Sequence, residues 1–268
     1  RIAGMFSSTR LLPLLLCLAF ACDGPPEAEP DAGPAPTDAR VADGGRDADV
    51  ADAGPAPRPP ALEVDFADRT RTVDPERAAE GAGTDEDPWN PWQAMALAAP
   101  GDVVGWLPGV AVGDPSLGQS RYQPAFQPQV SGTADAPIVH VAQNLAALTS
   151  AGRTELRSGA TEAGAGRPAF GVEGVDYVQW IGFLSDESAA DNAGVNDSGP
   201  AVLWSTTGSA IRYCELIGVD GVVADNHSGV RVEGVFDVVV ADNVIHGFQS
   251  SGGSSVNQAG VISYGTRR

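Results

Sequence analysis

Short runs of alternating apolar residues recur along the second half of the chain, and they limit its possible folds more than any other feature. Each run has a short strand-like stretch, a tight turn rich in Gly, Asp, Asn or Ser, and a second apolar stretch. The copies are Ala169–Phe183, Ala201–Ile217 and Gly229–Ile245, with a fourth starting at Gly260. With Gly182, Glu215 and Asn243 in register, the copies are offset by 33 and 28 residues. Such a period indicates stacked repeats, because one unit of this size cannot bury its apolar face alone.

The repeats predict an all-β solenoid, a parallel β-helix, over residues 61–268. In this interpretation Val172, Val202 and Val230 form one inward column. A second inward column contains Phe183, Leu216 and Val244. The alternative is an antiparallel sandwich, whose neighbouring strands are typically joined by turns of the Asn-Gly kind. No Asn-Gly pair occurs in the chain, which favours the parallel β-helix.

One helix is expected, at the start of the solenoid. Residues 90–99 place Asn90 at the N-cap and Pro91 at the first helical position, and the residues that follow are rich in Ala. A strand is expected next, at Val103–Leu107, and no convincing helical period follows it.

The N-terminus resembles an export signal. Arg10 precedes a ten-residue apolar run, Leu11–Phe20, which is shorter than the roughly 20 residues that a membrane-spanning helix needs. The run ends in Ala-Phe-Ala followed by Cys22, which is similar to the lipobox of bacterial lipoproteins and implies cleavage before Cys22 and acylation of its thiol. Cleavage near Ala21 with plain secretion is one alternative, and a buried apolar segment is another.

Residues 23–60 have the composition of a disordered linker. They contain almost only Asp, Ala, Gly, Pro, Glu and Arg, and so cannot bury enough apolar surface to offset the entropy cost of ordering. The expected organisation is a lipoprotein-type signal at 1–22, this linker at 23–60 and the β-helix at 61–268. The expected location is the cell envelope, through a lipid anchor in the membrane, or the extracellular space.

The charged residues of the chain argue against one class of partner and exclude mechanisms that need a lysine. There are 35 acidic residues against 16 basic ones, a net charge of -19, and every basic residue is Arg. So acidic a chain repels phosphate backbones, which argues against nucleic acid as a partner. The absence of Lys excludes a lysine base, a lysine Schiff base and a phosphate-loop lysine within these residues.

Several segments together resemble the right-handed parallel β-helix proteins of the pectate-lyase-like superfamily, over roughly residues 80–265. The segments are Gly83–Trp89, Trp92–Val104, Ser131–Val139, Gly229–Val235 and Asn243–His246. The resemblance implies a right-handed solenoid whose open end is shielded by the short helix. It also implies several further coils, since the chain stops at Arg268 just after opening a new coil, which is typical of a fragment.

Lyases of this superfamily act on uronate polysaccharides with Ca²⁺ held by Asp side chains and a Lys or Arg base. Asp220, Asp225 and Asp242 are therefore the candidate Ca²⁺ ligands. The alternative is that these Asp-Asn pairs form turn positions at the corners of the coils. Ala-Asp-Asn recurs at 190, 224 and 241, which favours the turn interpretation.

Arg212 and Arg231 lie at polar-facing positions of predicted strands, so either is a candidate for binding a substrate carboxylate. Solvation of an exposed strand is the alternative for both. Trp180, Trp204 and Tyr213 would form a sugar-stacking strip if they faced outward, and the alternative is that they pack in the core. His227 and His246 are candidate acid–base groups. Cys214, in an apolar stretch, is expected to be a buried, unreactive thiol.

Two functions of different classes follow from these observations. The first is a surface-anchored glycan-binding or scaffold module without catalysis, which the missing Lys favours. The second is a polysaccharide lyase that acts on uronate-containing polysaccharide, with its catalytic coils beyond residue 268. No zinc, Ser-His-Asp or phosphate-loop signature is present in the sequence.

Overall fold

The computed structural model describes residues 64–117, 120, 122–143, 152–160, 167–192, 199–219, 227–248 and 259–265. All of them belong to one compact unit, Pro59–Arg268. The predicted signal, the linker and Cys22 lie outside the described residues. Among the helices that the structure describes, none has the length and hydropathy needed to cross a bilayer.

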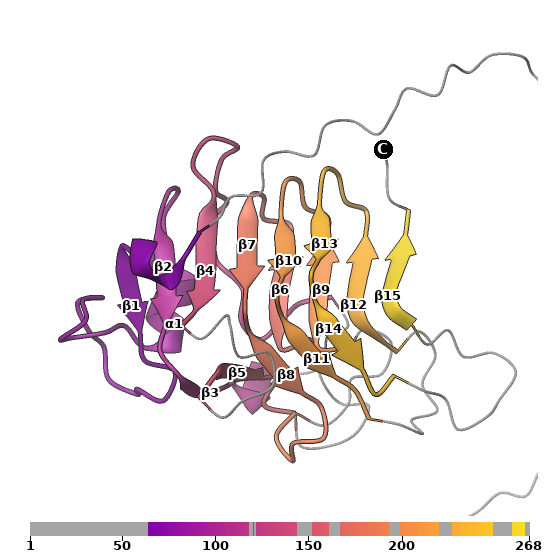
Figure 1. Ribbon diagram of the computed structural model, residues 1–268, viewed down its shortest axis with the longest axis horizontal. Coiled ribbons are helices and arrows are strands. Elements are labelled where there is room, and N and C mark those ends of the chain that lie inside the picture. The colour runs from indigo at the N-terminus through magenta and orange to yellow at the C-terminus, as the bar shows by residue number, and fades with distance from the viewer. Residues whose placement is uncertain are drawn as a thin grey trace, which may run out of the picture. The chain divides into compact units, whose positions relative to one another are not determined.

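Parallel strands form three sheets in the described part of the chain (Figure 1). Sheet A contains, in order, β1 (Arg71–Val73), β2 (Val103–Trp106), β4 (Ile138–Ala142), β7 (Val178–Ile181), β10 (Ala210–Arg212) and β13 (Val239–Ala241). Sheet B contains β3 (Gly109–Val112), β5 (Thr154–Arg157), β8 (Leu184–Asp186), β11 (Glu215–Ile217) and β14 (Val244–His246). Sheet C contains β6 (Phe170–Glu173), β9 (Ala201–Trp204), β12 (Ser228–Glu233) and β15 (Ala259–Tyr264).

From β4 onward each turn of the chain contributes one strand to each sheet, as β7, β8 and β9 do, and strands of neighbouring turns pair with one another. The predicted parallel β-helix is therefore confirmed. Each coil has three strands, whereas the repeats predicted two. The short strands of sheet B were missed because a corner of only two residues, Gly182-Phe183, separates β7 from β8.

The strand register differs from the predicted one. Ala210 pairs with Gln179 in the coil before it and with Val239 in the coil after it. The true offsets between coils are therefore 31 and 29 residues, and the predicted 33 and 28 are wrong.

Both predicted inward columns are wrong for the same reason. In sheet C, Val172, Leu203 and Val232 are cross-strand partners in the core, while Val202 pairs with Arg231 on the opposite face. In sheet B, Val244 pairs with Glu215 and not with Leu216. A shift of one residue moves a strand side chain to the other face of its sheet, because side chains alternate with a period of two.

Aromatic rings fill the interior of the first coils. The Trp106, Phe126, Phe170, Trp180 and Phe183 side chains are all fully buried. Trp106 meets the edge of Phe183 with ring centroids 5.7 Å apart, and Phe170 lies 5.4 Å from Trp180. Such contacts stabilise a fold beyond the area they bury.

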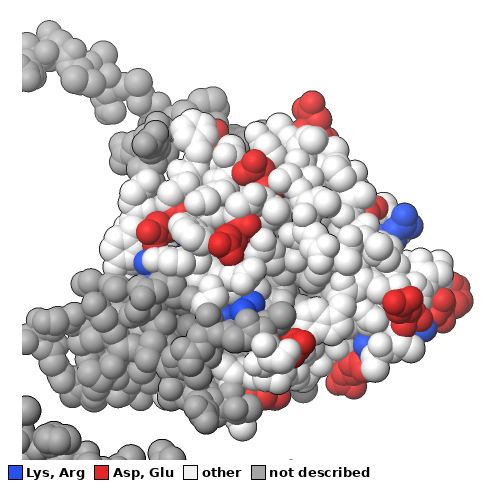
Figure 2. All heavy atoms as spheres, turned by 180° about the vertical axis from the view of Figure 1, so that it is seen from behind, with Lys and Arg blue, Asp and Glu red and all other residues white. Residues whose placement is uncertain are grey.

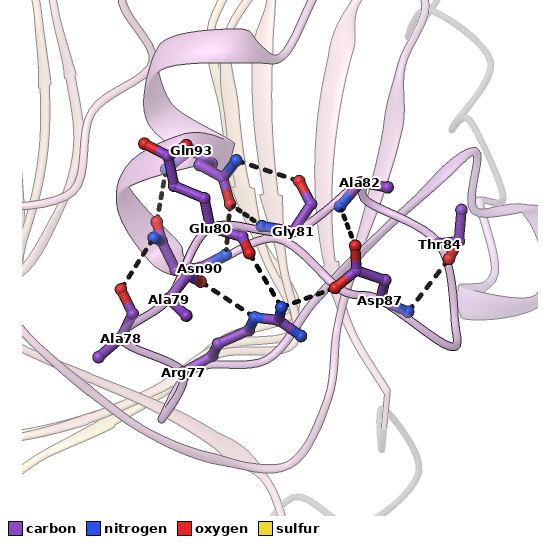
Figure 3. A network of polar contacts seen from close by, with 10 residues as sticks. All are labelled: Arg77, Ala78, Ala79, Glu80, Gly81, Ala82, Thr84, Asp87, Asn90 and Gln93. Atoms are coloured by element: carbon purple, nitrogen blue, oxygen red, sulfur yellow. Dashed lines mark hydrogen bonds and ion pairs between the residues drawn. The ribbon is translucent and has the colours of Figure 1, made fainter.

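A network of polar contacts fixes the one described α-helix, α1 (Pro91–Leu97), to the loop before it (Figure 3). Asn90 accepts a hydrogen bond from the Gln93 backbone N–H at 2.8 Å, and the Gln93 side chain accepts one from the Asn90 N–H at 3.2 Å. Gln93 also accepts from Gly81, and Arg77 pairs with Asp87 at 2.6 Å in the same loop. The predicted helix and its N-cap are confirmed.

Two 3-10 turns, η1 (Phe66–Asp68) and η2 (Pro115–Leu117), complete the described elements. Phe66 of η1 packs on the outer face of sheet A with Val139, Val141 and Ile181. This part of the outer face of sheet A is therefore apolar and covered.

Candidate functional site

The outer face of sheet C gathers polar and aromatic side chains from successive coils. Two columns of cross-strand partners face outward there, alternating with the core columns. The first column contains Gly171, Val202, Arg231 and Ile262; the second contains Glu173, Trp204, Glu233 and Tyr264. The second column is half-buried, so its side chains combine fixed positions with access to solvent.

Three aromatic side chains and one Arg lie in contact on this face. The rings of Trp204 and Tyr122 are stacked, with centroids 4.1 Å apart and planes 29° apart. The guanidinium carbon of Arg231 lies 4.9 Å from the Tyr122 ring centroid and 5.1 Å from that of Tyr264. These separations are close to the spacing of about 4.8 Å between paired strands. Trp204, Arg231 and Tyr264 come from three adjacent strands, β9, β12 and β15. We call the three aromatic residues, Tyr122, Trp204 and Tyr264, the aromatic row.

Arg231 is held on this face by an acidic neighbour. Its Nε and Nη2 both donate to Glu233 Oε2, at 3.0 Å and 2.7 Å. The Arg231 side chain is only 6 % exposed, against 29 % for Glu233. The predicted substrate-binding Arg231 thus lies within the candidate site, with its charge matched by Glu233.

A second Arg lies near the first strand of sheet C. Arg167 is 5 % exposed, and burial lowers its pKa while the nearby carboxylates of Glu173 and Asp114 oppose that shift. Gln127 donates to the backbone oxygen of Glu173 at 2.8 Å, which ties the preceding loop to the same edge.

Arg212 lies on a different sheet. It projects from β10 of sheet A, pairs with Asp242 at 3.2 Å and donates to the hydroxyl of Tyr213 at 3.2 Å. The structure therefore does not bring Arg212 and Arg231 together.

The candidate metal ligands are only partly described. Asp220 and Asp225 lie outside the described residues, and Asp242 pairs with Arg212. In the part of the chain that the structure describes, no three His, Cys, Asp or Glu side chains are grouped as metal ligands would be. The Ca²⁺ site stays a prediction.

The described Asp-Asn pairs have turn geometry. Asp242 has a positive φ of 58°, and Asn243 accepts from the Cys214 N–H at 2.9 Å while donating to the Ile211 oxygen at 2.9 Å. Asn192 likewise accepts from the Ser158 N–H at 2.8 Å. These contacts are those of side chains that shape corners of the coils.

The two candidate acid–base histidines have carboxylate neighbours. His227 Nε2 lies 2.6 Å from Glu187 Oε2, and both side chains are fully buried. His246, half-exposed, lies 3.4 Å from Glu215. Glu215 in turn is bound by the buried Arg153 at 2.7 Å. His246 faces solvent from sheet B, away from the aromatic row on sheet C.

The predicted strip of sugar-stacking aromatics does not exist as such. Trp180 is fully buried in the core, and Tyr213 lies at the corner between sheets A and B. Of the three residues only Trp204 lies on sheet C. Cys214 is fully buried, and burial raises the pKa of its thiol to about 11, as expected for an unreactive cysteine.

Sequence reasoning missed Tyr122, Glu233 and Tyr264. Glu233 and Tyr264 occupy the same repeat position as Trp204, so the correct register would have grouped them. Tyr122 lies in a loop before β6, the first strand of sheet C, and therefore occupies no position in the repeats.

Acidic residues outnumber basic ones in the solenoid. Residues 61–268 carry 26 acidic residues and 11 Arg. Figure 2 shows red acidic side chains spread over the face seen from behind, with fewer blue ones.

No family model and no curated protein matches the chain. Among solved structures the chain is similar to a pectate lyase, Pel9A, with 17 % sequence identity and a TM-score of 0.36. The match covers 74 % of this chain and 62 % of the pectate lyase chain, so the chain spans less than two thirds of that structure. The assignment as a parallel β-helix rests on the strand pairing described above, and not on this similarity.

Proposed function

We propose that the solenoid is a polysaccharide-binding module without catalysis, and that it binds along the outer face of sheet C. The observation that carries the proposal is the aromatic row, whose three rings are half-buried. Trp204 and Tyr264 come from strands on either side of β12, and Tyr122 comes from an earlier loop. Rings of this kind offer apolar surface for the C–H faces of sugars and polar tips for their hydroxyl groups. A row that follows the stacking of coils suits a long polymer better than a small molecule.

Carboxylates beside the row support the same function. Glu173 and Glu233 lie in the same outward column as Trp204. An ionised carboxylate accepts hydrogen bonds from several hydroxyl groups at once, and sugars supply such donors in pairs.

The test is affinity electrophoresis of the full chain in gels that contain different polysaccharides. Trp204→Ala should weaken binding by about fivefold, the loss of one aromatic contact of roughly 1 kcal/mol. Tyr213→Ala is the matched control, since it removes an exposed aromatic ring from the corner between sheets A and B. Equal effects of the two substitutions would contradict binding at sheet C. Release of unsaturated products from a polyuronate with Ca²⁺ would show a lyase instead.

We further propose that a lipid on Cys22 presents the solenoid at the cell envelope. The apolar run before Cys22 and the Pro- and Asp-rich segment after it support this proposal. Metabolic labelling with a fatty-acid probe should mark the wild-type chain and leave Cys22→Ser unlabelled. Labelling of both would overturn the assignment of the anchor to Cys22.

A further inference from the structure

We propose that the outer face of sheet C selects a neutral, hydroxyl-rich polysaccharide over a polyuronate, an inference that rests on the proposed function. The basis is that Arg231 and Arg167, the described Arg side chains nearest to sheet C, already have carboxylate neighbours, while the aromatic row supplies uncharged contact surface.

Arg231 has one of its two carboxylate-binding edges occupied by Glu233. A carboxylate is recognised best by two parallel N–H groups of the guanidinium fork. In Arg231 the Nε and Nη2 donors of one such edge both point to Glu233 Oε2, at 3.0 Å and 2.7 Å. The guanidinium also lies over the rings of Tyr122 and Tyr264, and the side chain is 6 % exposed. A uronate that approached this edge of Arg231 would have to displace Glu233 first.

Arg167, three residues before β6, also has carboxylates nearby. It is 5 % exposed and lies within the electrostatic reach of Glu173 and Asp114. The half-buried acids Glu173 and Glu233 therefore leave no net positive charge on this face among the described residues. A polyuronate would bring further negative charge against a domain that carries 26 acidic residues and 11 Arg. Like charges brought together in this way oppose binding.

Arg231 is thus a positioning residue for the aromatic row. Its guanidinium contacts Tyr122 and Tyr264, and its Nη2 donates to the Tyr122 hydroxyl at 3.5 Å. Glu233 fixes that guanidinium in place. Uncharged sugar rings would then pack against the row, with their hydroxyl groups bonded to the tyrosine hydroxyls and the carboxylates.

The experiment compares retention of the full chain by a neutral glucan or mannan with retention by polygalacturonate, with and without Ca²⁺. Wild-type chain should bind one neutral polymer at least about tenfold more tightly than polygalacturonate without Ca²⁺. Glu233→Gln should release the Arg231 guanidinium and raise affinity for polygalacturonate, an increase that salt should suppress.

Glu155→Gln is the matched control. Glu155 pairs with Arg157 two residues along a strand at 2.7 Å, the same spacing as Arg231 and Glu233, but on sheet B. This control removes the same charge from the other face, so it should leave affinity for polygalacturonate unchanged.

The outcomes separate the two levels of the proposal. Tighter binding of polygalacturonate than of every neutral polymer by wild-type chain, with Trp204→Ala still weakening it, would overturn the preference and leave binding at sheet C intact. Equal gains from Glu233→Gln and Glu155→Gln would show a general charge effect and overturn the role of Arg231. Retention by no polymer at all would overturn both the preference and the proposed function. The wild-type comparison stands even if Glu233→Gln fails to fold.

Discussion

Residues with positive φ form the corners of the coils. Gly182, Tyr213 and Asp242 follow the sheet A strand in three successive coils and have φ values of 83°, 53° and 58°. The left-handed conformation costs a non-Gly residue about 1–2 kcal/mol, and tertiary contacts must offset that cost. At Tyr213 the contact with Arg212 is one such offset. The tight corner between sheets A and B therefore needs one left-handed residue in each of these coils, and not glycine in particular.

Substitutions at two glycines of other corners distinguish the cost of backbone strain from the cost of steric overlap. Gly174 has φ 67° and open space where a Cβ would stand, while a Cβ on Gly199, φ 78°, would overlap the carbonyl oxygen of Ser228. Gly174→Ala should lower the free energy of unfolding by about 1–2 kcal/mol, the cost of the left-handed backbone alone. Gly199→Ala should lower it by clearly more. Urea denaturation of both variants measures the difference, and equal losses would contradict the close approach at Gly199.

His140 makes stability depend on pH. Its ring is fully buried against Trp180, with centroids 4.4 Å apart, and burial lowers its pKa to about 3 from 6.5. The unfolded chain therefore binds a proton that the folded chain excludes between these values. Stability should be complete above pH 6.5 and should fall as the pH drops toward 3, by about 3 kcal/mol at pH 4.5.

His140→Phe should flatten that loss. The variant should be less stable at pH 7 by roughly 1–3 kcal/mol, because the Trp106 indole N–H loses its acceptor, His140 Nδ1, at 3.2 Å. Its unfolding free energy should then fall less steeply than that of wild-type chain between pH 6.5 and 4.5. The comparison of the two slopes removes the contribution of the carboxylates, which titrate in both. Parallel slopes would show that His140 takes up its proton in the folded state.

At the scale of elements, the sequence predicted the helix correctly, but it did not predict where the chain turns at the corners of the coils. The helix α1 was predicted because Asn90, Pro91 and the Ala-rich body act within one turn. The strands of sheet B were missed because apolar residues continue through the corner, as at Ile181 and Phe183 on either side of Gly182. The pattern of such a stretch therefore predicts one continuous strand, although the chain turns within it.

The candidate site was half predictable for the same physical reason. Arg231 and Trp204 could be singled out as outward polar or aromatic residues of strands. Their shared face with Tyr264 depends on the strand register, and the offsets predicted from the sequence were wrong by two residues and by one. Tyr122 packs on Trp204 from a loop without periodicity, so only tertiary structure reveals the row.

A buried ion pair links the residue just before β5 to β11, two strands away in sheet B. Arg153 lies just before β5, binds Glu215 of β11 at 2.7 Å and donates to the oxygen atoms of Gly182 and Phe183 at the corner between. Glu215→Gln should cost about 3–5 kcal/mol of stability, since it leaves a buried guanidinium without its counter-charge. Asp242→Asn is the control, because Asp242 is half-exposed and its pair with Arg212 should contribute about 1 kcal/mol or less.

Thermal unfolding of both variants measures the difference between the two pairs. A double variant, Arg153→Leu with Glu215→Leu, should recover part of the loss because it removes both charges together. Equal destabilisation by Glu215→Gln and Asp242→Asn would mean that burial does not distinguish these pairs.

At the scale of the whole molecule, stability is distributed along the stack of coils. From β4 onward each described coil is paired with the next in all three sheets, so the interior side chains of one coil complete the core of the next. The composition of residues 23–60 predicts no such core in the segment before it. The two parts of the chain should therefore respond very differently to a protease.

Trypsin is a direct probe of this contrast, because the chain has no Lys and every cut must follow an Arg. Arg40 and Arg46 lie in the predicted linker, while Arg153, Arg167 and Arg231 of the solenoid are 5–6 % exposed. Brief digestion should give products that begin at Val41 and Asp47, with the three solenoid sites intact. Urea should make those three sites cleavable as well, because their protection depends on folding. Cleavage after Arg153, Arg167 or Arg231 in native chain before cleavage after Arg40 would contradict both the predicted linker and the continuity of the stacked core.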